Sequence, residues 1–201
     1  MAKQHLKYYC CKFDQAVDHK MWSALLTEGL KSQAVMTWHN ENTGYFVDSE
    51  NLKADLMKLI GLWESEVTGS ITLVISHCFD EFTRQALELA ERYRKGSIVN
   101  LSEVALLAIV KNEDNFLKTF YTYFNGVDEE LLATMTSYLS HNFLAGKTAE
   151  SLYIHRNTWR YRYQKFQRLT GIDLQDFDDA IFFQTWLSWR KIPPTWLLSD
   201  K

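Results

Sequence analysis

Apolar residues follow two different periods in the first part of the chain. Spacings of three and four residues, which place side chains on one face of a helix, recur in several segments. They predict helices over residues 13–30, 52–63, 80–94 and 103–110. Runs rich in β-branched and aromatic residues separate these segments. They predict strands over residues 33–39, 45–47, 71–76 and 97–101, the first two joined by a turn that ends at Gly44.

The pattern changes near residue 112, beyond which every apolar segment has the helical period. The helices predicted there cover residues 115–124, 128–141, 148–152 and 157–170. We therefore predict an α+β protein, with a mixed α/β N-terminal domain over residues 1–111 and an all-α domain over residues 112–191. Residues 192–201, which contain Pro193 and Pro194, are predicted to be a tail.

Composition limits the classes of function. Of the 201 residues, 46% are hydrophobic and 23% are charged, which excludes a chain that is disordered throughout. The longest apolar runs fall far below the ~20 residues of a membrane span. Residues 1–12 lack the apolar region of a secretory signal. We therefore expect a cytoplasmic protein without a membrane partner.

Positive charge is concentrated in one segment, although the net charge is −3. Residues 155–168 contain no acid and five basic side chains: Arg156, Arg160, Arg162, Lys165 and Arg168. A mildly acidic chain with one short basic segment indicates that any contact with a polyanion is local to that segment.

Residues 145–170 have the pattern of a helix-turn-helix motif, in which a short helix and a tight turn precede a capped second helix. Residues 148–152 supply the short helix, with Ala149 as the small residue that faces its partner. Residues 153–155 form the turn, from which Ile154 can reach the core. Asn157 is predicted to cap the second helix, because its side-chain oxygen can accept a backbone N–H, and Gly171 is predicted to end it.

The second helix of this motif has two chemically different faces. At about 100° per residue, four side chains lie together and are predicted to pack inward: Trp159, Tyr163, Phe166 and Thr170. The opposite face carries donors, cations and an aromatic ring: Arg160, Tyr161, Gln164, Lys165 and Arg168, with Asn157 and Thr158 at its leading end. Such a face fits the major groove, where donors reach base edges and cations neutralise phosphates. Arg162 lies between the faces, and we assign it to a phosphate or to an intramolecular acid.

A run of motif residues extends this pattern into a specific signature. It reads Thr148-Ala149, Leu152, Ile154-His155-Arg156-Asn157-Thr158 and Arg160-Tyr161-Arg162, followed by Leu169-Thr170-Gly171-Ile172-Asp173-Leu174. This run resembles the C-terminal helix-turn-helix of the PucR/CdaR family of bacterial transcription regulators. The resemblance extends to residues 131–141, which match the preceding helix, and it implies a closing helix over residues 176–190. Residues 97–107 are similar to the passage that joins this module to a GGDEF-like α/β domain. The chain departs from the family at Trp159 and Tyr163, where smaller aliphatic side chains are usual.

The resemblance implies a transcription regulator that binds double-stranded DNA and acts as a homodimer. It also implies a GGDEF-like remnant over residues 1–111, with any small-molecule effector unidentified. The candidate DNA-binding residues are Lys147, Thr148, Arg156, Asn157, Thr158, Arg160, Tyr161, Arg162, Gln164 and Lys165. His155 is assigned to bracing the turn rather than to reading a base.

Catalysis finds no support in the sequence, and we predict no enzyme activity, no cofactor and no metal. The common phosphate-binding glycine motifs, a GG[DE]EF sequence and an H-E-x-x-H pair are all missing. His77 and Cys78, taken as neighbours on a strand, point to opposite faces, which argues against a base and nucleophile pair. Adjacent Cys10 and Cys11 have neither metal nor redox spacing, so buried thiols are expected, with a metal site shared with a nearby histidine as the alternative.

Two other functions are compatible with the same sequence. In one, the module keeps the motif, has lost contact with DNA, and binds a protein partner through aromatic faces. In the other, the α/β domain senses a small molecule. The aromatic residues near the C-terminus are expected to pack in the core of the closing helix, with self-association as the alternative and Trp196 as its first candidate. They are Phe182, Phe183, Trp186, Trp189 and Trp196.

Overall fold

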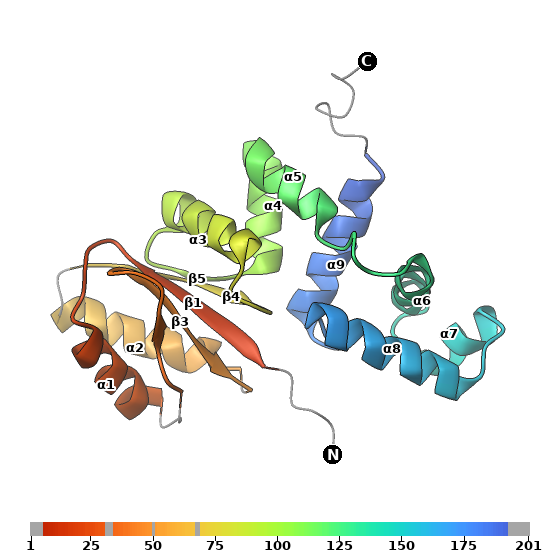
Figure 1. The fold of residues 1–201 in the computed structure, drawn as a ribbon, viewed down its shortest axis with the longest axis horizontal. Helices are drawn as coiled ribbons and strands as arrows, with labels where there is room; N and C mark the ends of the chain where they lie inside the picture. Colours follow the sequence, from red (N-terminus) through yellow and green to blue (C-terminus); the bar gives the residue numbers. More distant parts are fainter. Residues whose placement is uncertain (1–5, 31–33, 50, 67–68, 193–201) are drawn as a thin grey trace. The chain divides into compact units, whose positions relative to one another are not determined.

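A computed structural model describes residues 6–30, 34–49, 51–66 and 69–192, apart from the side chains of 63–66. The chain divides into two compact units, Met1–Val104 and Ala105–Lys201, and the division falls within helix α4, Leu101–Lys111 (Figure 1). Strands and helices alternate in the first unit, whereas the described part of the second is helical. The predicted α+β class is therefore confirmed. The predicted domain boundary at residue 111 lies at the far end of the same helix.

The first unit is built on a five-stranded sheet in the order β2-β3-β1-β4-β5. Its strands are β1 (Lys7–Phe13), β2 (Thr37–Trp38), β3 (Thr43–Asp48), β4 (Ile71–Ser76) and β5 (Ile98–Asn100). Strand β1 is central and antiparallel to both neighbours, with Tyr9 opposite Phe46 on β3 and Ile75 on β4. Strands β4 and β5 are parallel, so the chain between them needs a crossover, which is helix α3 (Glu81–Arg94).

Strand β1 corrects the sequence prediction, which gave residues 1–12 no element and began a helix at residue 13. Phe13 ends β1, and the helix begins later, as α1 (His19–Leu30). Helices α1 and α2 (Lys53–Glu66) cover one face of the sheet and α3 covers the other (Figure 1). The sequence of a strand that is covered on both faces is a continuous apolar run, without the alternation of apolar and polar residues that marks a half-exposed strand. Tyr9, Cys10 and Cys11 are all buried accordingly.

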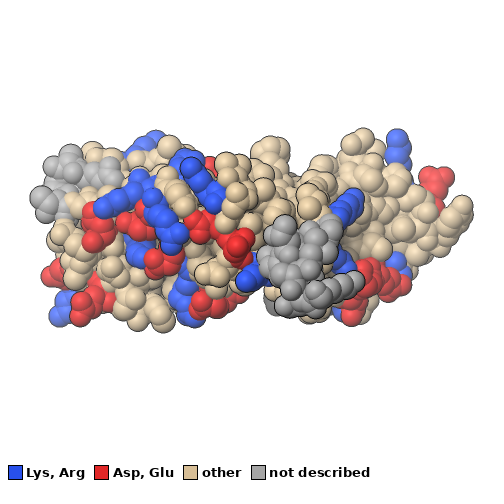
Figure 2. Space-filling model, turned by 90° about the horizontal axis from the view of Figure 1, so that it is seen from above, with Lys and Arg blue, Asp and Glu red and all other residues tan. Residues whose placement is uncertain are grey.

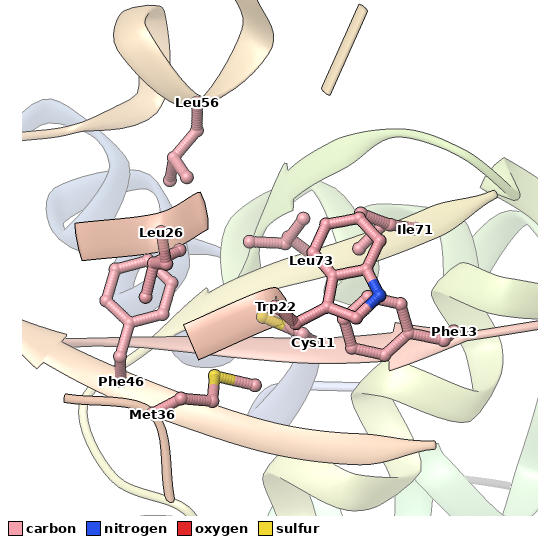
Figure 3. Close-up of a pocket in the computed structure, with 9 residues that line it drawn as sticks. All are labelled: Cys11, Phe13, Trp22, Leu26, Met36, Phe46, Leu56, Ile71 and Leu73. Atoms are coloured by element: carbon pink, nitrogen blue, oxygen red, sulfur yellow. The ribbon is translucent and has the colours of Figure 1, made fainter. Parts of the chain in front are cut away.

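The core between the sheet and helices α1 and α2 contains a small apolar cavity (Figure 3). Its wall includes Cys11 and Phe13 from β1, Trp22 and Leu26 from α1, and Leu56 from α2. The cavity volume is about 10 Å³, which is room for about one water molecule. Sites for metabolites are typically about 300–1,000 Å³. This cavity therefore gives no support to the alternative in which the α/β domain senses a small molecule.

The three cysteines are free thiols, with Cys10 and Cys11 buried in β1, as predicted, and Cys78 half-buried. Burial raises the pKa of Cys10 and of Cys11 far above the ordinary 9.0. Burial, and then the charge of Asp80, raise the pKa of Cys78 to about 12. His77 and Cys78 follow β4 rather than lie on it, so the argument from opposite strand faces was wrong. A thiol with so high a pKa is still a poor nucleophile at neutral pH.

The buried thiols predict a loss of stability at alkaline pH. Above about pH 9 a cysteine ionises in the unfolded chain, while burial keeps Cys11 protonated in the folded protein. The unfolded state then binds fewer protons, so the free energy of unfolding falls as the pH rises, by about 1.4 kcal/mol per pH unit for each buried thiol. We expect Cys11→Ala to reduce this slope by about that amount in urea titrations above pH 9. Equal slopes for variant and unmodified protein would contradict the assignment.

The second unit has an aromatic core. After α4 its described helices are α5 (Asp114–Thr122), α6 (Glu129–Ser140), α7 (Ala145–Ser151), α8 (Arg156–Thr170) and α9 (Phe177–Arg190). Phe124, which follows α5, has ring centroids within 4.6–6.3 Å from Phe166, Phe182, Phe183 and Trp186. All are buried, so core packing is confirmed for the aromatic residues of α9 at 182, 183 and 186. Trp196 lies outside the described residues.

In the described part of the chain, no group of three or more His, Cys, Asp or Glu side chains is placed to hold a metal ion. Within the same part of the chain, no helix is both long and apolar enough to cross a membrane.

Candidate nucleic-acid interface

Helices α7 and α8 are the two helices of the predicted helix-turn-helix, joined by residues 152–155. The turn places Tyr153 in the left-handed region, with φ of 53°, and leaves its side chain 98% exposed. The backbone N–H of Ile154 donates to the carbonyl of Ala149 at 3.0 Å, which closes the turn. Ala149 is buried, as expected for the small contact residue, and Ile154 is half-buried. Helix α7 begins at Ala145, three residues earlier than predicted.

The start of α8 differs from the prediction that Asn157 is the cap. The helix begins at Arg156 and is capped by His155, whose Nδ1 accepts a hydrogen bond from the backbone N–H of Asn157 at 3.2 Å. An imidazole nitrogen without a proton thus accepts the hydrogen bond that a side-chain oxygen usually accepts at the cap position. Asn157 lies in the first turn, with its side chain exposed. The assignment of His155 to bracing the turn agrees with this geometry.

The cap predicts a measurable contribution of His155 to stability. We expect His155→Ala to lower the free energy of unfolding by about 0.5–2 kcal/mol, because the N–H of Asn157 loses its acceptor. His155→Asp supplies another acceptor and should restore most of that loss. Urea denaturation followed by circular dichroism measures both variants. A His155→Ala variant as stable as the unmodified protein would show that the hydrogen bond contributes nothing.

The inward face of α8 is held by aromatic side chains. Tyr163 and Phe166 are buried, while Trp159 and Thr170 are half-buried. The Tyr163 hydroxyl donates to Asp173 Oδ1 at 2.5 Å, and its ring lies 5.1 Å from that of Trp159. Burial, and then the hydrogen bond to Asp173, raise the pKa of Tyr163 above its ordinary value. These contacts give the two aromatic departures from the family pattern a structural role.

Gly171 ends α8 as predicted. Its φ of 74° lies in the left-handed region that glycine favours, and its N–H donates to the carbonyl of Gln167 at 2.8 Å.

Three consecutive acids at the start of α6 hold α8 and α9: Asp128 at the cap position before the helix, and Glu129 and Glu130 in its first turn. Lys165 Nζ lies 2.6 Å from Asp128 Oδ2, and the Arg190 guanidinium lies 2.7 Å from the Glu129 carboxylate. The third pair joins Arg162 to Glu130, and the same guanidinium donates to Thr134 at 3.2 Å. Arg162 was assigned to a phosphate or to an intramolecular acid, and in the structure it is paired with such an acid, Glu130.

The outward face of α8 is exposed along its whole length. Seven polar or aromatic side chains form this surface, which we call the outward face: Arg156, Asn157, Thr158, Arg160, Tyr161, Gln164 and Arg168. Among the described residues, none of the acids forms an ion pair with Arg156, Arg160 or Arg168. The face therefore presents unneutralised cations and amide donors on a helix whose other side is fixed in the core.

The predicted site residues fall into three groups. Six of them share the outward face, and Lys147 is exposed on α7. Arg162 is paired with Glu130 of α6, and Lys165 with Asp128 at the cap position before α6. Thr148 is buried, and its hydroxyl donates to the carbonyl of Leu144 at 2.9 Å, so this side chain holds α7 and cannot reach a DNA phosphate. Sequence reasoning also missed Asp128, because nothing local to that residue indicates its pairing with Lys165.

Charges in the first unit are interspersed. Figure 2 shows lysine and arginine side chains next to acidic ones over this unit, on the face in view. Pairs such as Lys12 with Glu88 and Lys95 with Asp14 account for part of the mixture. Such a surface offers less attraction to a polyanion than the outward face of α8 does.

Residues 131–188, which span α6 to α9, match the model of the PucR C-terminal helix-turn-helix domain. The chain is 41% identical over 51 residues to the carbohydrate diacid regulator of Escherichia coli (strain K12). It is 46% identical over 48 residues to the proline-responsive transcriptional activator PutR of Bacillus subtilis (strain 168). A longer but weaker similarity, 25% over 122 residues, is to a "leucine-rich protein" of Streptococcus dysgalactiae subsp. equisimilis.

These similarities cover only part of each protein. The matched segment covers 25% of this chain and 13% of the carbohydrate diacid regulator. For PutR the two shares are 24% and 12%, and for the leucine-rich protein they are 60% and 42%. The match to the PucR C-terminal helix-turn-helix domain is thus confined to residues 131–188 of the second unit.

Proposed function

We propose that the second unit binds double-stranded DNA by placing the outward face of α8 in the major groove. The observation that carries this proposal is the division of α8 into two sides. Tyr163 and Phe166 are buried, whereas Asn157, Arg160 and Gln164 are exposed. A helix fixed in this way presents donors in a defined geometry, which is what base recognition requires.

The length of α8 assigns different roles to the two ends of its outward face. Asn157 and Arg168 are separated by about 16 Å along the axis, at 1.5 Å per residue, whereas the major groove is about 12 Å wide. Recognition helices contact base edges with their N-terminal residues. Asn157 and Arg160 are therefore the candidates for base contacts, while Arg168 and Lys147 are candidates for phosphates.

We further propose a transcription regulator that acts in the cytoplasm as a homodimer. Two of the relatives are named as a regulator and an activator. One copy of α8 offers few unpaired cations, so a single module should bind weakly, and two copies on one DNA site would bind more tightly. The half-sites would then be about 34–36 Å apart, or a multiple of that spacing. The same proposal includes a GGDEF-like remnant domain over residues 1–111 and a small-molecule effector that remains to be identified.

A salt titration tests DNA binding directly. Fluorescence anisotropy with a labelled random duplex should give affinities that fall as salt rises, with a log–log slope of about −0.9 per phosphate neutralised. The double variant Lys147→Gln with Arg168→Gln, which removes the two candidates for phosphate contacts, should make that slope shallower by up to about 1.8. A matched control, Arg84→Gln with Arg94→Gln on α3, removes the same charge elsewhere. No salt-sensitive binding at low ionic strength would overturn the proposal and favour the protein-interaction alternative.

A further inference from the structure

Lys165 lies at the edge of the outward face and is already neutralised within the protein. Its Nζ is 2.6 Å from Asp128 Oδ2, and its side chain is 35% exposed. Arg162, the other α8 cation held by α6, is only 16% exposed. Of these two cations, Lys165 is therefore the one that a phosphate can approach.

The carboxylate of Asp128 is not used to cap a helix. Asp128 precedes α6 at the cap position, but its side chain accepts no capping hydrogen bond, and it is 61% exposed. Its hydrogen bond to Lys165 raises the pKa of that ammonium group, which therefore stays charged. The carboxylate can thus be replaced without removing a cap from α6.

We propose that Asp128 competes with DNA phosphates for Lys165 and so limits the affinity of the protein for DNA of any sequence. The proposal rests on the DNA-binding function proposed above. Without DNA, Lys165 is paired with Asp128, and on DNA its flexible stem allows the ammonium group to exchange this partner for a phosphate. Because the pair with Asp128 must first be broken, the contact between Lys165 and a phosphate contributes less to the free energy of binding.

This competition acts on sequence-independent binding. Binding to random DNA depends on the number of phosphates that cations neutralise, whereas sequence discrimination depends on contacts to base edges. Asp128 weakens the first kind of contact at Lys165. Of the two candidates for base contacts, Asn157 is uncharged, and Arg160 pairs with no acid among the described residues. The effect of Asp128 should therefore be equal on a preferred and on a random duplex.

The test is the substitution Asp128→Asn, which keeps the shape of the side chain and removes its charge. We expect affinity for a random duplex to rise about two- to fivefold at low salt, the equilibrium factor of an exposed ion pair. The slope against log salt should steepen by up to about 0.9. Adding Lys165→Gln to this variant should abolish the gain.

Glu129→Gln is the matched control. It removes one negative charge from the neighbouring residue but releases Arg190, which lies on α9 rather than α8. We expect it to change affinity less than Asp128→Asn does, with circular dichroism confirming that both variants are folded. Equal gains in the two variants would assign the effect to net charge. No gain in Asp128→Asn would show that Asp128 does not compete with phosphates for Lys165. Either result overturns this inference. If the unmodified protein shows no salt-sensitive binding, the proposed function fails and this inference fails with it.

Discussion

Phe166→Ala is expected to lower the free energy of unfolding by about 3–5 kcal/mol, the cost of removing a buried aromatic ring. The ring is fully buried, and its centroid lies 6.1 Å from that of Phe124 and 5.4 Å from that of Phe183. It connects α8 to the aromatic core of the second unit. The variant should therefore lose the fixed orientation of the outward face together with stability.

Urea denaturation measures this effect, and Leu169→Ala provides a control on the same helix. The Leu169 side chain is 56% exposed, so its removal should cost less than about 1 kcal/mol. Comparable losses in the two variants would mean that Phe166 does not anchor α8, and the account of the two faces would be wrong.

Arg160→Ala is expected to weaken binding to a preferred DNA sequence by about 1–3 kcal/mol, the cost of one base contact. Arg160 is exposed near the start of α8 and, among the described residues, pairs with no acid. The guanidinium can donate two hydrogen bonds to one guanine, which is the basis of discrimination at that position. Anisotropy titrations with preferred and random duplexes at one salt concentration measure the difference.

Two comparisons interpret this result. Arg94→Ala, on helix α3 of the first unit, removes an exposed positive charge that is not part of the outward face and should leave binding nearly unchanged. An equal loss for Arg160→Ala on both duplexes would assign the residue to a phosphate instead of a base. No loss on either duplex would remove Arg160 from the interface.

Helix α8 could be predicted in part because its C-terminal end carries a local signal: Gly171 ends it with a left-handed φ. Asp176 caps α9 by accepting hydrogen bonds from the N–H groups of Asp178 and Asp179, a local signal that the sequence prediction did not use. Helical periodicity also identified the buried Tyr163 and Phe166. In these segments local propensity and tertiary packing agree, so the sequence alone is informative.

Strand β1 could not be predicted in the same way because its burial depends on distant segments. Both neighbours in the sheet, β3 and β4, come later in the chain, and helices cover both faces. Its residues therefore lack the alternation of a half-exposed strand. The helical spacing of Phe13 with Val17 was misleading, since Phe13 packs against Trp22 with ring centroids 4.8 Å apart while still on the strand.

The sequence predicted which side chains lie on the outward face of α8, but it did not predict which residues they pair with. Periodicity places Lys165 toward the outward face, yet the acid that pairs with it, Asp128, is 37 residues away at the cap position before α6. Thr148 matches the family motif, but its position in α7 is buried. The cap at His155 was missed because histidine accepts this hydrogen bond only through an unprotonated nitrogen, which residue preferences do not reveal.

Selection from a random duplex library, using the full chain, tests most directly the claim that the outward face of α8 reads DNA in the major groove. We expect enrichment of a short motif, arranged as an inverted repeat with half-sites about 34–36 Å apart or a multiple of that spacing. We also expect Asn157→Ala with Arg160→Ala to abolish the enrichment in a folded protein. A library that stays random with the unmodified chain, or that yields the same motif with the double variant, would contradict this claim.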